Sequence, residues 1–131
     1  MSYKGQPVPS TTYQSHRAKV SDGKSVRVVV PASTEVVAQQ FSLIGGFLGA
    51  AMQSVTTGAG ETSEVILNIE QAEFETNQIS TSQAFAAGTA IYWNATTSKF
   101  TETDTDNHLV GRVTAAKDAN NVIWFILGPQ V

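Results

Sequence analysis

The sequence predicts an all-β fold: a small barrel or sandwich with one short helix and an extended N-terminal arm. Short runs of β-branched and aromatic residues alternate with glycine- and asparagine-containing turns along most of the chain. At 131 residues the chain is long enough to bury one hydrophobic core. The beginning of the chain lacks the apolar residues for such a core. We therefore expect an arm over residues 1–24 and a β-domain over residues 25–131.

The predicted arm lacks the sequence features of both a helix and a hydrophobic core. Pro7 and Pro9 disfavour a helix, and large apolar side chains are too sparse to build a core. Those present are Met1, Tyr3, Val8, Tyr13 and Val20. The segment is therefore predicted to be an extended arm, and a loose terminal tail is the alternative.

Charge separates the arm from the body. Residues 1–27 carry five basic residues against one acid, a net charge of +4. The rest of the chain carries three basic residues against ten acids, a net charge of −7. A net charge of −3 for the whole chain argues against a general nucleic-acid binder, whose phosphate contacts need clustered Lys and Arg.

The first strands are predicted between residues 25 and 52. Residues 25–30 form a β-branched run that ends at Pro31, and residues 35–37 add a short strand. Residues 41–52 are apolar enough for a buried helix, but three glycines within five positions oppose one at about 1 kcal/mol each. Two short strands joined through Gly45 and Gly46 fit better.

The middle of the chain is predicted to hold a loop, two strands and the helix. Residues 57–61 form the glycine-containing loop, and residues 64–69 and 72–76 supply strands. Residues 80–88 offer hydroxyl side chains as a helix N-cap, alanines within and a terminal glycine. This segment is the predicted two-turn helix.

The last third alternates strands and turns. Strands are predicted over residues 90–93, 99–101, 109–113 and 122–127. The last of these is apolar on both faces, so both faces need a cover. The opposite sheet would supply one cover, and a subunit interface would supply the other.

The sequence contains no recognisable catalytic or metal-binding pattern. His16 and His108 are the two histidines, and no G-x-S-x-G motif accompanies them. The glycines at residues 45–49 match neither a dinucleotide nor a Walker motif. Residues 104–107 begin like a calcium loop but lack its distal bidentate Glu. The chain also contains no cysteine. We therefore expect no enzymatic activity, no cofactor and no metal.

Three aromatic residues in apolar strands, Trp93, Trp124 and Phe125, are predicted to be core or interface anchors. If the tryptophans were exposed instead, a carbohydrate- or receptor-binding β-module would be the alternative. No apolar run reaches the roughly 18 residues that a membrane helix needs, and no signal peptide is apparent. The expectation is a protein made in a cytoplasm that does not bind membranes.

From residue 25 to residue 127 the order of elements resembles the capsid cement, or head decoration, proteins of tailed bacteriophages. Four landmarks carry the resemblance: residues 26–32, residues 43–51, residues 86–94 followed by 99–101, and residues 109–113. The third is the most specific, with a glycine turn, a strand ending Tyr92-Trp93 and a Lys-aromatic-Thr return. The chain departs from the pattern at Asn94, where an aspartate is usual, and in its longer arm.

The resemblance implies a structural protein on the outer surface of a phage capsid, made in the host cytoplasm. It implies two partners: the major capsid protein, and further copies of the chain in a homotrimer that braces neighbouring capsid subunits. The arm is the expected capsid-binding segment, since extended arms can add strands to a neighbour's sheet edge. Its candidate contact residues are Tyr3, Lys4, Tyr13, Arg17 and Lys19.

Overall fold

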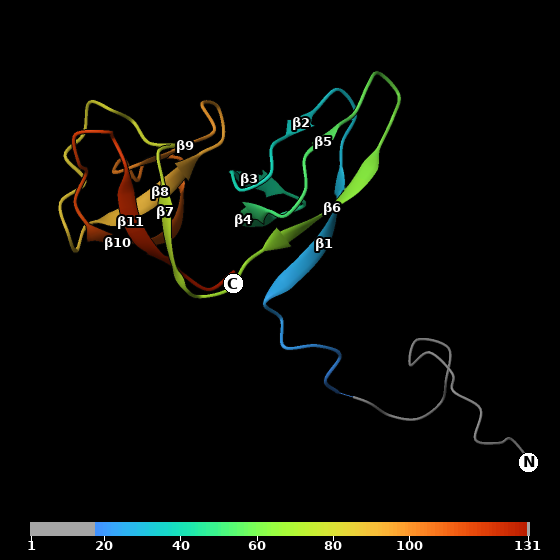
Figure 1. Ribbon diagram of the computed structural model, residues 1–131, viewed down its shortest axis with the longest axis horizontal. Helices are drawn as coiled ribbons and strands as arrows, with labels where there is room; N and C mark the ends of the chain where they lie inside the picture. The colour runs from blue at the N-terminus through green and yellow to red at the C-terminus, as the bar shows by residue number, and fades with distance from the viewer. Residues whose placement is uncertain (1–17, 131) are drawn as a thin grey trace, which may run out of the picture.

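The computed structural model describes residues 18–130, and these residues form eleven β-strands and no helix. Two larger sheets, one from each half of the sequence, lie side by side, and a short two-stranded ribbon accompanies the first (Figure 1). The prediction of an all-β fold is confirmed.

The N-terminal sheet has four strands in the order β1-β6-β4-β3, and each neighbouring pair is antiparallel. The strands are β1 (Ser25–Val30), β3 (Phe41–Ile44), β4 (Phe47–Ala51) and β6 (Ser63–Asn68). The separate ribbon pairs β2 (Glu35–Val36) with β5 (Val55–Thr56). Val36 and Val55 of this ribbon pack against the N-terminal sheet in one hydrophobic cluster.

The C-terminal sheet has five strands in the order β7-β11-β10-β8-β9 and curls into half a barrel (Figure 1). The strands are β7 (Glu73–Thr76), β8 (Ala90–Asn94), β9 (Lys99–Thr101), β10 (His108–Ala115) and β11 (Ile123–Leu127). All four pairings are antiparallel, and β10 has register shifts near Gly111 and near Val113.

The β3–β4 hairpin turns through Gly45 and Gly46, as the sequence predicts. Both glycines have positive φ angles, 61° and 88°. A two-residue turn with two positive φ angles matches the twist of the flanking strands, and glycine adopts these angles without steric cost. The glycines that oppose a helix are therefore the residues that make the hairpin possible.

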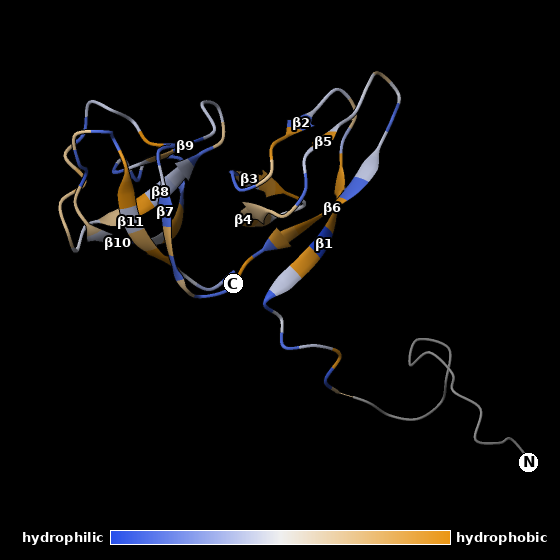
Figure 2. Cartoon of the chain, in the orientation of Figure 1, coloured by the Kyte–Doolittle hydropathy of each residue, from blue (hydrophilic) through white to orange (hydrophobic). Residues whose placement is uncertain are grey.

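The same hairpin contributes to both hydrophobic clusters that residues 18–130 form, because successive side chains of a strand point to opposite faces. Phe41, Leu48 and Ala50 join the cluster of the C-terminal sheet. Ile44 and Ala51 join the cluster between the N-terminal sheet and the ribbon. Figure 2 shows the apolar strands of both sheets on either side of this hairpin. Apolar packing thus couples the two sheets through β3 and β4.

Aromatic rings fill the larger cluster. The ring of Phe41, from the N-terminal sheet, lies 5.3 Å from those of both Phe100 and Phe125. Phe100 lies 4.9 Å from Phe125 and 4.9 Å from Trp93. Rings at these separations attract one another beyond the burial of their surface.

Two glutamine side chains take the place of missing strand partners along the β3–β4 hairpin. The Gln78 amide accepts from the Phe41 N–H at 2.6 Å and donates to the Phe41 C=O at 3.0 Å. Gln130 pairs in the same way with Leu48, with both distances 3.0 Å. Each amide satisfies one donor and one acceptor of a strand residue, as a neighbouring strand would. Both glutamines belong to the C-terminal half, so these polar contacts also join the two sheets.

We expect Gln78→Glu to destabilise the protein at neutral pH by about 1–3 kcal/mol, because the carboxylate cannot donate to the Phe41 carbonyl and leaves it unpaired. A protonated carboxyl group regains one donor. The destabilisation relative to wild type should therefore shrink between pH 7 and pH 4, as chemical denaturation would measure. Gln53→Glu is the control, since Gln53 accepts one bond from the Ile66 N–H and no donated bond is recorded for it. An equal effect of both substitutions would contradict this role of Gln78.

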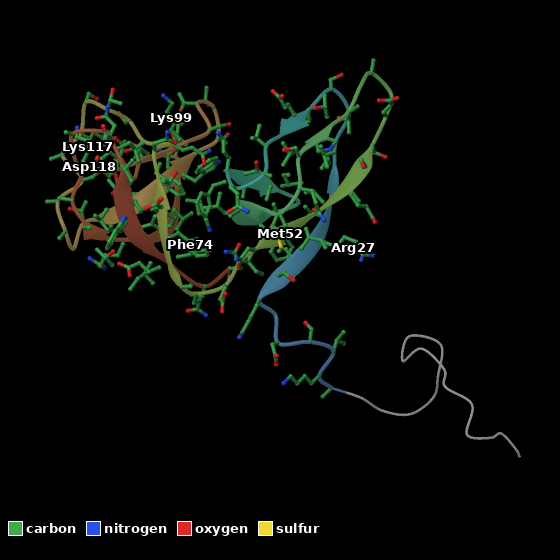
Figure 3. All side chains as sticks on the ribbon, in the orientation of Figure 1. Arg27, Met52, Phe74, Lys99, Lys117 and Asp118 are labelled. Carbon is green, nitrogen blue, oxygen red and sulfur yellow. The ribbon has the colours of Figure 1, made fainter. Side chains whose placement is uncertain are left out.

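The predicted helix over residues 80–88 is wrong: the segment is a loop. A helix would use the Thr81 and Gln83 carbonyls for N–H groups four residues later. Instead, both carbonyls accept from the Lys117 ammonium group, at 2.8 and 2.7 Å (Figure 3 labels Lys117). The Phe85 N–H donates to the Glu102 carboxylate.

Burial of Phe85 explains why this loop has a fixed form. Phe85 has a φ angle of 51°, outside the helical region, and its side chain is fully buried in the larger cluster. Gly88 follows with a φ angle of 89°. The loop thus gains an aromatic core residue and polar partners from distant strands in place of local helical bonds.

Candidate assembly surface

Strand β11 divides its apolar side chains between two faces of the C-terminal sheet. Ile123, Phe125 and Leu127 are fully buried in the larger cluster. Trp124 and Ile126 point the other way and are 49% and 48% exposed. The second face of this apolar strand therefore has no cover among the described residues of the chain.

Strand register places charged residues on both sides of this exposed pair. Ile126 lies opposite Glu73 of β7 on one side and opposite Arg112 of β10 on the other. Trp124 lies opposite Glu75. Directly opposed residues of an antiparallel pair point to the same face of a sheet. We call this surface the outer face; it consists of Glu73, Glu75, Leu109, Arg112, Trp124 and Ile126.

A bulge in β10 brings Leu109 and Arg112 to the same face. Val110 and Val113 are buried, whereas Leu109 and Arg112 are exposed, so the two exposed residues are three positions apart instead of two or four. The register shift between Leu109 and Gly111 accounts for the odd spacing. Leu109 is 56% exposed and extends the apolar part of the outer face.

Two shallow hollows lie on the outer face. One, of about 580 Å³, is lined by residues that include Leu109, Ile126, Pro129 and His108. The other, of about 220 Å³, lies beside Trp124 between Glu73 and Glu75. The surface is therefore uneven, with apolar side chains from β10 and β11 and two carboxylates from β7.

The charged groups of the outer face make few contacts within the chain. Arg112 donates from Nη1 to the Gly88 carbonyl at 2.6 Å. Glu73 accepts from the Thr114 hydroxyl at 2.6 Å. The three ion pairs recorded among residues 18–130 involve neither Arg112 nor the two β7 carboxylates.

The aromatic residues singled out in the sequence lie in different environments. Trp93 is 3% exposed, and Phe125 is fully buried; both belong to the larger cluster. Trp124 lies on the outer face, and the described residues leave it half exposed. An interface role for Trp124 stays a prediction.

Four of the five candidate arm contacts, Tyr3, Lys4, Tyr13 and Arg17, lie outside the described residues. The fifth, Lys19, is exposed and pairs with Asp22 at 2.7 Å. The described part of the arm, residues 18–24, leads away from the sheets beyond the start of β1 (Figure 1). Lys24 anchors its end, since its carbonyl accepts from the Ile69 N–H and its ammonium group lies 3.7 Å from the Glu70 carboxylate.

Asn94, the departure from the expected aspartate, has a structural role in the β8–β9 turn. Its side-chain oxygen accepts from the N–H groups of Thr96 and Thr97 at 2.9 and 3.2 Å. Asn and Asp side chains both form such turns. Asn94 therefore supplies the acceptor that this turn requires.

Within residues 18–130, no three His, Asp or Glu side chains are grouped so that they could hold a metal ion. In the same part of the chain every buried side-chain nitrogen or oxygen has a hydrogen-bond partner. No helix among these residues has the length and apolarity to span a membrane.

Exposed apolar residues with charged neighbours, as on the outer face, are common at protein–protein contact surfaces. The chain belongs to the phage cement protein family, whose model matches residues 20–128. Membership identifies a structural phage protein associated with the capsid. Neither the curated proteins nor the solved structures contain a significant match to the chain.

The apolar pattern of β11 indicates that the strand needs a second cover, but the sequence does not indicate that Arg112, Leu109 and the β7 carboxylates are its neighbours. Glu73 and Glu75 belong to a predicted strand, but nothing near them in the sequence indicates that this strand pairs with β11. Gly111, within a run of strand-forming residues, was the one signal of a bulge that could have placed Leu109 and Arg112 on one face.

Proposed function

We propose that this protein binds the outer surface of a phage capsid as a homotrimer and stabilises the shell by bridging neighbouring major capsid subunits. The observation that carries the proposal is the family match over residues 20–128, which covers nearly all of the β-domain. The protein would be made in the host cytoplasm and would act on the virion. It would need no cofactor, nucleic acid or membrane.

The division into an arm over residues 1–24 and a β-domain over residues 25–131 supports a clamp-like attachment. The arm region is basic, and the rest of the chain is acidic. A basic extended segment can contact acidic surface or a sheet edge of a capsid subunit. Three arms on one trimer would act at high effective concentration, so weak individual contacts would add to tight attachment.

A trimer is supported by the exposed apolar residues of β11 and by Leu109 beside them. A protein–protein interface of ordinary size covers about 800 Å² per partner. An interface of this size would cover the central residues of the outer face.

The alternative is a carbohydrate- or receptor-binding module of the virion. The hollow beside Trp124, flanked by Glu73 and Glu75, favours it, because an exposed ring and two carboxylates can stack on and accept from a sugar. Glycan binding that Trp124→Ala abolishes, in a protein that does not decorate heads, would favour this alternative.

The test is reconstitution on purified heads that lack the protein. Full-length protein should decorate the heads, as imaging would count. A variant without residues 2–24 should keep its β-sheet circular dichroism and its oligomeric state but occupy far fewer sites. Raising the salt concentration should weaken the full-length protein more than the truncated one, because screening acts on the arm's charges.

The matched control keeps the arm's length and removes its charge by Lys4→Ser, Arg17→Ser and Lys19→Ser. Its occupancy should fall between those of the full-length and truncated proteins. If the truncated protein decorates heads as fully as the intact one, with the same salt response, the β-domain alone carries the binding. If the intact protein fails to decorate heads at all, the proposed function is wrong.

A further inference from the structure

We propose that the outer face is the contact between copies of this chain, with Arg112 of one copy against Glu73 and Glu75 of the next. The inference rests on the proposed homotrimer and names the surface that would form it. Charge complementarity across the exposed apolar centre carries the argument.

The charges of the outer face are asymmetric about β11. Glu75 lies on the β7 side and Arg112 lies on the β10 side. Glu73 also starts from β7, and its carboxylate reaches across β11 to the Thr114 hydroxyl of β10. If copies surround an axis roughly parallel to β11, the acidic side of each copy meets the basic side of its neighbour. The contact is then head-to-tail. Such contacts form a closed ring when the rotations from each copy to the next add up to one full turn. Three copies would bring three β11 strands to the axis.

The Arg112 and Glu73 side chains can each form further hydrogen bonds. An arginine side chain has five N–H donors, and the one bond recorded for Arg112 uses Nη1. Glu73 accepts one recorded bond, and a carboxylate can accept about four. Arginine pairs with carboxylates through two parallel bonds, which also fixes their relative orientation. Arg112 can therefore keep its bond to the Gly88 carbonyl and still engage a neighbour.

The centre of the contact would be apolar. Trp124 and Ile126 are each about half exposed and lie on β11, between the strands that carry Glu75 and Arg112. Tryptophan and arginine are enriched among the residues that dominate binding energy, at the centre of interfaces and shielded from water by their surroundings. The outer face combines both residue types with acidic partners, whereas the opposite face of the same sheet is filled by the core.

The absence of cysteine allows a direct test by disulfide cross-linking of the variant Glu73→Cys/Arg112→Cys. Within one chain these positions are separated by β11, so two strand spacings put them about 9.5 Å apart. A disulfide needs its two Cα atoms within about 7 Å. Any bond between the two cysteines therefore joins different copies.

On mild oxidation we expect this variant to give cross-linked dimers and trimers and no larger species, as denaturing electrophoresis would show. A twofold face-to-face contact would stop at dimers, and an open chain of copies would continue beyond trimers. The control is Glu73→Cys/Lys99→Cys, because Lys99 is an exposed base at the far end of the β8–β9 hairpin (Figure 3). This control variant should not give the series of cross-linked dimers and trimers.

Charge exchange supplies the second measurement. Arg112→Glu alone should abolish the trimer by light scattering, while Lys99→Glu should leave it intact. Adding Glu73→Arg and Glu75→Arg to Arg112→Glu should restore a trimer. Mixed with wild type, this restored protein should form separate trimers, since every mixed contact places like charges together.

Both measurements apply to free protein and to protein bound to heads. Absence of the cross-linked trimer in both settings, or a trimer unaffected by Arg112→Glu, would overturn the inference. If the variants that fail these tests still decorate heads, the proposed capsid-binding function holds, and copies of the chain do not contact one another through the outer face. If wild-type protein forms the cross-linkable trimer but never binds heads, the inference stands and the proposed function falls.

Discussion

Trp93→Ala should lower the free energy of unfolding by about 3–5 kcal/mol, the usual cost of truncating a large buried aromatic side chain. Trp93 is 3% exposed, and its ring packs edge-on against Phe100 at 4.9 Å. Truncation would leave a cavity beside the aromatic cluster that joins the two sheets. Denaturant unfolding followed by circular dichroism would measure the change.

Trp124→Ala is the matched control for this prediction. The residue type is the same, but the side chain is half exposed on the outer face. At concentrations where the protein is monomeric, its truncation should change stability by only about 0.5 kcal/mol, as for a surface substitution. If both variants lost the same free energy of unfolding, the burial of Trp93 would not contribute more to stability than the half-exposed Trp124.

Gly111→Ala should destabilise the protein by about 3 kcal/mol or more. A side-chain carbon at this position would overlap the Ile126 carbonyl oxygen of the neighbouring strand and press on the Phe125 ring. The obstacle is backbone within the sheet, so relief would require β10 to move away from β11. Overpacking of this kind commonly costs about 1–3 kcal/mol and sometimes more. Thermal or denaturant unfolding would show the loss.

Gly58→Ala tests whether glycine replacement alone has this effect. The added carbon at Gly58 would meet the Glu61 carboxylate at 2.9 Å, which is the far end of a flexible side chain. Moving it aside would weaken only the exposed bond that this carboxylate accepts from the Gly58 N–H. Its cost should stay below about 1 kcal/mol. If Gly111→Ala is as mild as Gly58→Ala, then the close approach of β10 and β11 is not a constraint on this sequence.

The strands were predictable because local patterns determine them. The β-branched run of β1 and the two glycines of the β3–β4 turn need no distant partner to be recognised. The helix prediction failed for the opposite reason. Lys117 and Glu102 supply the partners of the loop at residues 80–88 from far along the chain, and local propensity contains no information about them.

The candidate surface was predictable only in part. Apolar residues on both faces of β11 indicated that something besides the core must cover it. Which residues lie beside them depends on strand order and on the β10 bulge, and neither follows from periodicity. The family, in contrast, was recognisable from the order of its landmarks and is confirmed by the family match.

The two glutamine contacts lie at the same strand residues that carry the apolar contacts between the sheets. Displacement of one sheet relative to the other must pull the Gln78 and Gln130 amides from Phe41 and Leu48, and it must also draw the side chains of Phe41 and Leu48 out of the larger cluster. Polar and apolar contacts between the sheets should therefore be lost together. The two halves are expected to unfold in one step, because neither can leave the other without opening the shared core.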